Sequence, residues 1–233
     1  MSCSASPKRT GLPVPAERRY ALIVFDWDGT LIDSADVIVE CIRAAAREMA
    51  LPVPERERAR HVIGLGLHDS LSHAVPSLPR EQYADFAERY RQHFVAREDA
   101  LQLFPGVREL LERLALRGHR LALATGKSRR GLDRALQASG LGGLFVASRC
   151  GDETQPKPHP AMLYELMREL DTEARCALMI GDTSHDLQMA RSAGMDALGV
   201  TYGAHPASTL RVEAPLQCIA SVEELRRWLE ANA

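Results

Sequence analysis

Residues 20–30 read Tyr20-Ala21-Leu22-Ile23-Val24-Phe25-Asp26-Trp27-Asp28-Gly29-Thr30. The first six form a short, nearly continuous apolar run, which is typical of a parallel strand buried on both faces. Asp and Gly, which follow the run, are common in turns. The stretch therefore predicts a buried strand that ends in a loop carrying two carboxylates.

The strand pattern recurs along the chain. Apolar runs predict strands at residues 20–25, 120–124, 144–147, 176–180 and 197–201, with a weaker one at 218–220. Helical patterns lie between most of them, at residues 107–117, 129–138, 160–170 and 182–193. Three of these helical patterns stop at or near a glycine, a common signal for the end of a helix. Alternating strands and helices predict an α/β fold with a doubly wound parallel sheet.

Residues 34–103 depart from this alternation. They contain no strand pattern, but helical stretches at residues 35–49, about 59–73 and 81–97 are separated by prolines. About seventy residues is too long for a simple connection between two strands. We therefore expect an inserted α-helical cap at residues 34–103 and a catalytic core at residues 20–33 and 104–233. Residues 1–19 lack the apolar segment of a secretion signal, and we expect a disordered tail there.

The composition argues against several kinds of partner. The chain has 233 residues and a net charge of -2, without the basic excess of most nucleic-acid or anionic-membrane surfaces. No apolar run approaches the roughly 18 residues that a membrane helix needs. Five cysteines are scattered without paired spacing, which favours free thiols in a reducing compartment. We expect a cytoplasmic protein with no nucleic-acid or membrane partner.

Polar residues follow four of the predicted strands. In a doubly wound sheet, ligands bind beyond the carboxyl ends of the strands, so these residues should meet at one edge. The set comprises Asp26 and Asp28 after the first strand, Thr125, Gly126 and Lys127 after the second, Lys157 after the third, and Asp182 and Asp186 after the fourth.

These residue types suit phosphoryl transfer. Clustered carboxylates hold Mg²⁺, and a hydroxyl, an ammonium and helix N-terminal N–H groups hold phosphate. One remaining carboxylate can attack phosphorus and another can act as acid and base. Lys157 is suggestive because the chain has only three lysines, and a compact ammonium suits phosphate as a point charge.

The run from Asp26 to Thr30 resembles the DxDGT signature of haloacid dehalogenase-type phosphohydrolases. Thr125, Lys157 and the Asp182/Asp186 pair resemble the second, third and fourth motifs of that family, in the right order. The resemblance covers roughly residues 20–220 and implies a Rossmann-like core with a helical cap. Within the family, residues 26–34 look most like phosphoglycolate phosphatases and their relatives.

The resemblance implies hydrolysis of a small phosphorylated metabolite, with 2-phosphoglycolate as the leading candidate, through an aspartyl-phosphate intermediate and with Mg²⁺ as cofactor. It implies the following roles: Asp26 as nucleophile and metal ligand, Asp28 as general acid/base with its backbone carbonyl on the metal, Thr125 and Lys157 on the phosphoryl group, Asp182 on Mg²⁺, and Asp186 supporting the metal directly or through water.

Other residues are candidates for substrate binding. Gly126 and Lys127 adjoin the second motif, although a lysine at a helix start is equally well explained as exposed. In the cap, Arg60 and His61 could contact an acidic leaving group, whereas the alternative is a solvated or packed helical turn.

Four alternative functions have different requirements. A dehalogenase lacks the second carboxylate, so Asp28 argues against it. A phosphonate hydrolase of this family needs a lysine in the cap, and residues 34–103 contain none. A sugar phosphomutase uses the same catalytic residues and stays open. A non-enzymatic binding protein would not need every catalytic side chain, although a fold alone does not establish activity.

Overall fold

A parallel six-stranded sheet lies at the centre of residues 19–233, the part of the chain that the computed structural model describes. The strand order is β3-β2-β1-β4-β5-β6. The strands are β1 (Leu22–Phe25), β2 (Arg120–Thr125), β3 (Phe145–Cys150), β4 (Ala177–Gly181), β5 (Asp196–Val200) and β6 (Gln217–Ile219). The predicted α/β fold with a doubly wound parallel sheet is confirmed. The tail predicted at residues 1–19 lies outside the described residues except for Arg19.

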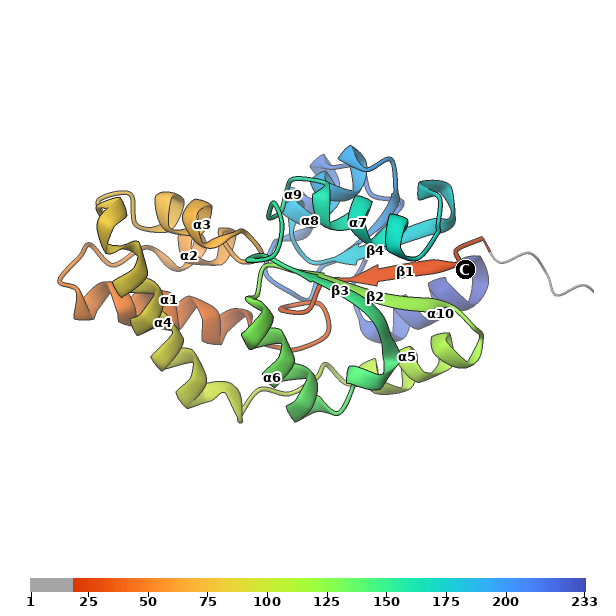
Figure 1. The fold of residues 1–233 in the computed structure, drawn as a ribbon, viewed down its shortest axis with the longest axis horizontal. Coiled ribbons are helices and arrows are strands. Elements are labelled where there is room, and N and C mark those ends of the chain that lie inside the picture. The colour runs from red at the N-terminus through yellow and green to blue at the C-terminus, as the bar shows by residue number, and fades with distance from the viewer. Residues whose placement is uncertain (1–18) are drawn as a thin grey trace, which may run out of the picture.

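Helices cover both faces of the sheet (Figure 1). One face carries α5 (Val107–Leu116), α6 (Arg129–Ser139) and α10 (Val222–Asn232), and the other carries α7 (Ala161–Glu169), α8 (Ser184–Ser192) and α9 (Ala207–Val212). Short 3₁₀ turns occupy Arg80–Gln82, Gly142–Leu144 and Ala174–Cys176. No helix within residues 19–233 is both long and apolar enough to cross a membrane.

The two helical layers explain the unbroken apolar run of β1. Successive residues of a strand point to opposite faces. Ile23 and Phe25 therefore pack with the first set of helices, and Leu22 and Val24 pack with the second. All four side chains are fully buried, so none of these positions suits a polar residue.

The first four helices after β1 lie together beyond the carboxyl ends of the strands, and β1 runs toward them (Figure 1). They are α1 (Ala35–Glu48), α2 (Arg56–His61), α3 (Leu67–Ala74) and α4 (Tyr83–Glu98), and their apolar side chains form a cluster of their own. The two segments that join them to the sheet run side by side. Asp33 N–H donates to Gln102 O (2.9 Å), and Phe104 N–H donates to Leu31 O (3.0 Å). The predicted cap boundaries fall at this pair of segments.

The helical stretch expected near residues 59–73 is two helices, α2 and α3, with a loop between them. Gly64 in this loop has φ +89°, a conformation that side-chain-bearing residues rarely adopt. A Cβ on Gly66 would lie 2.6 Å from Pro156 Cγ in the core. The break therefore lets the cap chain pass directly over the core.

The third strand is longer than the apolar run that predicted it. β3 continues through Arg149 to Cys150, whereas the run ends at Ala147. β3 lies at the edge of the sheet, where polar residues are tolerated, and Arg149 pairs there with Glu165 (2.7 Å). Helices α9 and α10 were not predicted.

Candidate active site

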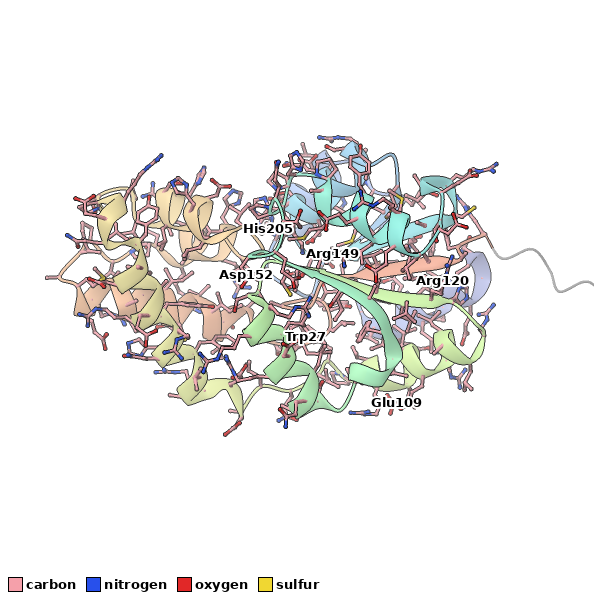
Figure 2. The ribbon with its side chains drawn as sticks, viewed as in Figure 1. Trp27, Glu109, Arg120, Arg149, Asp152 and His205 are labelled. Atoms are coloured by element: carbon pink, nitrogen blue, oxygen red, sulfur yellow. The ribbon has the colours of Figure 1, made fainter. Side chains whose placement is uncertain are left out.

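The carboxyl ends of β1, β2 and β4 bring three of the candidate residues together beneath the cap. Asp26 directly follows β1, Thr125 is the last residue of β2, and Asp182 directly follows β4. All three side chains are buried. Figure 2 places Asp152 and His205 at the same end of the sheet, facing the cap helices. The convergence follows from the parallel order, because the carboxyl ends of all the strands point the same way.

Lys157 is fully buried and reaches the centre of the site. Its Nζ lies 2.8 Å from Asp26 Oδ1 and 2.6 Å from Asp186 Oδ1. Burial alone would lower the pKa of this ammonium, but the charges of Asp186 and Asp26 outweigh burial and raise the pKa above its usual value. Lys157 is therefore held charged between two carboxylates.

The carboxylates outnumber the cations that touch them. Asp26, Asp182 and Asp186 offer oxygens within 4.8 Å of one another, and Lys157 is their one ion-pair partner within residues 19–233. Burial raises the pKa of Asp26 to about 7, because the charges of Asp186 and Asp28 add to burial and Lys157 only partly opposes it. Burial and the charges of Asp26 and Asp186 also raise the pKa of Asp182 well above its usual range. With all three carboxylates ionised, the group would carry more negative charge than Lys157 neutralises.

Asp26 and Asp182 fit a divalent cation. Both carboxylate oxygens of Asp26 are buried, and Oδ2 has no hydrogen-bond donor within residues 19–233, which is costly unless another group satisfies it. Asp182 accepts from Thr30 Oγ1 on Oδ1 (2.8 Å) and from Ala204 N–H on Oδ2 (2.7 Å). These bonds orient the carboxylate and leave lone pairs free. Carboxylate oxygens are the ligands that Mg²⁺ prefers, so these two residues would hold it.

Asp186 is committed to other contacts. Its Oδ2 accepts from Thr183 N–H (3.1 Å) and Thr183 Oγ1 (2.7 Å), and Thr183 Oγ1 accepts from Asp186 N–H in return. This reciprocal capping box begins α8. Because its other oxygen faces Lys157, this engagement favours contact with a cation through water over direct ligation.

Two glycines allow the chain to pass close to Asp182. A Cβ on Gly29 would lie 2.2 Å from Asp182 Oδ2, and a Cβ on Gly203 would lie 2.3 Å from the same atom. Gly29 also has φ +78°, which favours glycine. The glycine of the Asp26–Thr30 turn is therefore required both by its own backbone and by the carboxylate that faces it.

Two side chains hold Asp28. Ser34 Oγ donates to Asp28 Oδ1 (2.8 Å), and Lys127 Nζ lies 3.1 Å from Asp28 Oδ2. The Lys127 ammonium also lies 4.4 Å from the centroid of the Phe94 ring in α4, a cation–π distance. Lys127 therefore links Asp28 to the cap, and its side chain is not exposed as a lysine at a helix start would be. The Ser34 contact joins residues six positions apart within the stretch 26–34, whereas no sequence signal pointed to Phe94, because that contact depends on how the cap folds back.

Thr125 and Gly126 lie where the core meets the cap loop. Thr125 Oγ1 accepts from Lys127 N–H (3.2 Å). A Cβ on Gly126 would come within 2.5 Å of Gly64 O, so the two backbones are nearly in contact. Both core residues line a cavity of about 460 Å³ that also contacts Asp26, Asp28 and the cap.

Arg60 and His61 do not line this cavity. The Arg60 guanidinium pairs with Asp36 of α1, and the His61 ring stacks on His205 with centroids 5.0 Å apart. The residues that face the cavity are instead the loop residues that follow, 62–65. The structure does not bring Arg60 and His61 to this cavity, because α2 extends through both of them and their side chains contact Asp36 of α1 and His205 of the core. Their contact with the leaving group stays a prediction.

Three histidines join α2 to the core, an arrangement that the sequence did not reveal. Ser184 N–H donates to His205 Nδ1 (3.0 Å), so the proton of the neutral ring lies on Nε2, which donates to His61 O (3.0 Å). His185 Nε2 donates to the same carbonyl (2.8 Å). Burial lowers the pKa of His185 and lowers that of His205 to about 4, so both rings are neutral at neutral pH. We call His61, His185 and His205 the histidine clasp.

The histidine clasp has the spacing of a metal site, because one nitrogen of each ring lies within 4.8 Å of the others. Both nitrogens of His205 are, however, already used in hydrogen bonds, and His185 Nε2 is used as well. The clasp is therefore a hydrogen-bonded joint between the cap and the core.

Comparisons with known proteins agree with this geometry. Residues 23–200 match the Haloacid dehalogenase-like hydrolase family. The curated relative "Probable phosphatase IndB" of Dickeya dadantii (strain 3937) is 36% identical over 210 residues, which cover 88% of this chain and 91% of that protein. A "Phosphoglycolate phosphatase" of Yersinia pseudotuberculosis serotype I (strain IP32953) is 32% identical over 209 residues, which cover 87% of this chain and 90% of that protein. The chain belongs to the haloacid dehalogenase-like hydrolase family.

A solved structure extends the likeness to three dimensions. The crystal structure of a predicted phosphoglycolate phosphatase from Haemophilus somnus 129pt has a TM-score of 0.79 and 25% sequence identity to this chain. The match covers 91% of this chain and 99% of that one. The uncovered share is much shorter than residues 34–103, so the likeness includes most of the cap as well as the sheet.

Proposed function

We propose that the protein is a Mg²⁺-dependent phosphomonoester hydrolase that acts on a small phosphorylated metabolite through an aspartyl-phosphate intermediate. The observation that carries this proposal is the state of Asp26. Its carboxylate is buried beside the cavity, with the Lys157 ammonium 2.8 Å from Oδ1 and Asp182 nearby. Its Oδ2 has no hydrogen-bond donor within residues 19–233, so lone pairs of this carboxylate are available to attack phosphorus.

The proposed reaction has two displacements. An oxygen of Asp26 attacks phosphorus, the ester P–O bond breaks, and Asp28 gives a proton to the departing alkoxide. A water molecule then attacks the phosphorus and passes its proton to Asp28, which releases phosphate and restores Asp26. Lys157 and the Thr125 hydroxyl bind the oxygens of the transferred group throughout. When bound, Mg²⁺ supplies positive charge that offsets repulsion between the phosphate and the carboxylates.

Two observations support a small substrate. The cap covers one side of the cavity, which favours a small molecule over a protein or nucleic-acid substrate. The curated relative from Yersinia pseudotuberculosis is named a phosphoglycolate phosphatase, which makes 2-phosphoglycolate the leading candidate.

The test is phosphate release from a panel of esters: 2-phosphoglycolate, glucose 1-phosphate, AMP, a phosphopeptide and p-nitrophenyl phosphate. Each is assayed with Mg²⁺, after EDTA treatment and after Mg²⁺ is restored. We expect EDTA to abolish release, Mg²⁺ to restore it, and Asp26→Asn to abolish it for every ester. Full activity in EDTA, a preference for the phosphopeptide, or turnover by Asp26→Asn would contradict the proposal.

The same panel separates the alternative functions. A sugar phosphomutase would isomerise glucose 1-phosphate and would require a bisphosphate activator, whereas a hydrolase requires only water. A non-enzymatic binding protein would release phosphate from none of the esters. We expect release without any activator.

A further inference from the structure

The walls of the cavity differ sharply from its floor. The floor carries the polar groups of Asp26, Asp28 and Thr125. The cap side is formed largely by aliphatic and aromatic side chains, including Ile42, Leu71 and Phe86. A phosphate bound at Asp26 would therefore direct its alcohol part into an apolar chamber.

The cations that line the cavity are already paired. Lys127 Nζ lies 3.1 Å from Asp28, Arg134 Nε lies 3.0 Å from Glu98, and Arg91 Nε lies 2.8 Å from Glu88. They are the three cationic side chains of the cavity lining in the described part of the chain. The Lys127–Asp28 pair is the least exposed of the three, with both side chains 10% exposed, whereas Arg91 and Glu88 are 45% and 48% exposed. A second anionic group on the substrate would have to compete with these carboxylates for the cations, which disfavours it most near the buried pair.

Two hydroxyls interrupt the apolar wall. Ser70 of α3 donates to Val62 O and Leu65 O, whereas the Tyr90 hydroxyl of α4 makes no hydrogen bond within residues 19–233. The wall therefore offers one donor to a neutral polar atom of a substrate, and no free positive charge.

The cavity is also large for a two-carbon leaving group. Its volume of about 460 Å³ lies within the range of pockets that enclose much bulkier ligands, roughly 300–1,000 Å³. Each extra methylene buried against apolar walls strengthens binding about fourfold, so a larger apolar alcohol gains affinity that glycolate cannot.

From the paired cations and the apolar wall, we infer that the preferred substrate is a phosphate monoester of a neutral alcohol with a compact aromatic or branched aliphatic body. This inference rests on the proposed phosphomonoesterase activity and specifies its substrate class. It departs from 2-phosphoglycolate, whose leaving group carries a carboxylate.

The test compares kcat/KM for 2-phenylethyl phosphate, ethyl phosphate and 2-phosphoglycolate in Mg²⁺. All three are esters of alkyl alcohols, which keeps the chemistry of the leaving group similar. We expect 2-phenylethyl phosphate to exceed each of the others by at least about tenfold, because its ring adds several buried carbons. If 2-phosphoglycolate is the best of the three, the inference is wrong and the proposed activity stands. If no ester releases phosphate, both are wrong.

Two variants test the wall directly. Leu67 lines the cavity and is 52% exposed, so Leu67→Lys adds a cation at a position that tolerates charge. We expect it to raise the ratio of kcat/KM for 2-phosphoglycolate to that for 2-phenylethyl phosphate by about tenfold, whereas the isosteric control Leu67→Met should leave the ratio unchanged. An unchanged ratio in Leu67→Lys would contradict an anion-excluding wall.

The second variant, Leu71→Ala, removes apolar contact without adding charge. Leu71 is 4% exposed, and its truncation should lower kcat/KM for 2-phenylethyl phosphate by about tenfold but change that for ethyl phosphate by less than about twofold. Equal losses for both esters would show that Leu71 supports the fold and does not contact the substrate.

Discussion

Asp26 and Asp28 are the same residue type two positions apart, and the structure gives them different surroundings. Asp26 is buried, with Lys157 Nζ 2.8 Å from its Oδ1 and no donor to its Oδ2 within residues 19–233. Asp28 borders the cavity and accepts from Ser34 and Lys127. One carboxylate is thus positioned for attack on phosphorus, and the other for exchanging a proton with a group in the cavity.

Asp28→Asn tests this division at the residue scale. Asn keeps the shape and the backbone carbonyl but cannot carry the proton, so we expect kcat for an alkyl phosphate to fall about 10²–10⁴-fold. p-Nitrophenyl phosphate should be affected much less, because its leaving group needs no proton. The measurement is kcat for both esters, together with phosphate binding, which should change little.

The control for Asp28→Asn is Lys127→Gln, because it breaks the same ion pair while leaving the proton carrier in place. It should affect the alkyl and nitrophenyl esters to a similar extent. If Asp28→Asn also slows both esters equally, Asp28 has a structural role and is not the acid.

At the scale of elements, the site depends on how α2 and the loop after it meet the core. Gly64 lies against Gly126, and the carbonyl at the end of α2 accepts from two core histidines. Ring nitrogens of His185 and His205 are used in hydrogen bonds that hold the cap against the core. The histidine clasp therefore has a structural role.

His205→Phe removes one ring from the histidine clasp while preserving its approximate shape. Ser184 N–H then loses its acceptor in a buried region, and His61 O keeps only His185 as a donor. We expect the free energy of unfolding to fall by about 1–3 kcal/mol, measured by urea denaturation. The control His68→Phe replaces an exposed histidine in the same part of the cap. It should change the free energy of unfolding by less than about 0.5 kcal/mol. Similar losses in the two variants would argue against the clasp.

For the molecule as a whole, the buried carboxylates link stability to pH and to cations. The pKa of Asp26 rises from 3.8 to about 7 on folding, so between these values the folded state retains a proton that the unfolded chain has released. Raising the pH through this window therefore favours unfolding. The stabilising contribution is fully present below 3.8 and is lost as the pH passes about 7.

We expect this effect in thermal unfolding of the protein in EDTA. The Tm of the wild type relative to Asp26→Asn should fall as the pH rises from about 4 to about 7, because Asn does not titrate. Saturating Mg²⁺ should remove most of the fall, since a bound cation favours the ionised carboxylate. A Tm difference that is independent of pH in EDTA would show that Asp26 is not protonated in the metal-free fold.

The sequence predicted the structure best where the local residue pattern matches the surroundings that the fold provides. The apolar run before Asp26 predicted a buried parallel strand, because both faces of β1 are covered by helices. It was least informative in the cap, where the break between α2 and α3 depends on contact with Pro156 in the core. The sequence likewise did not show that Arg60 and His61 lie outside the cavity lining, since the residue pattern of a short polar helix does not indicate which way it faces.

The sequence by itself determined the class of fold and the chemistry gathered at one edge of the sheet, because short apolar runs followed by carboxylates, a hydroxyl and a lysine are local features. Only the tertiary structure decided which partners those groups contact. Lys157 lies between Asp26 and Asp186, Lys127 lies between Asp28 and Phe94, and an apolar wall lies above them. These contacts join residues far apart in the chain. Burial and distance, which govern their charges, exist only once the cap has packed onto the core.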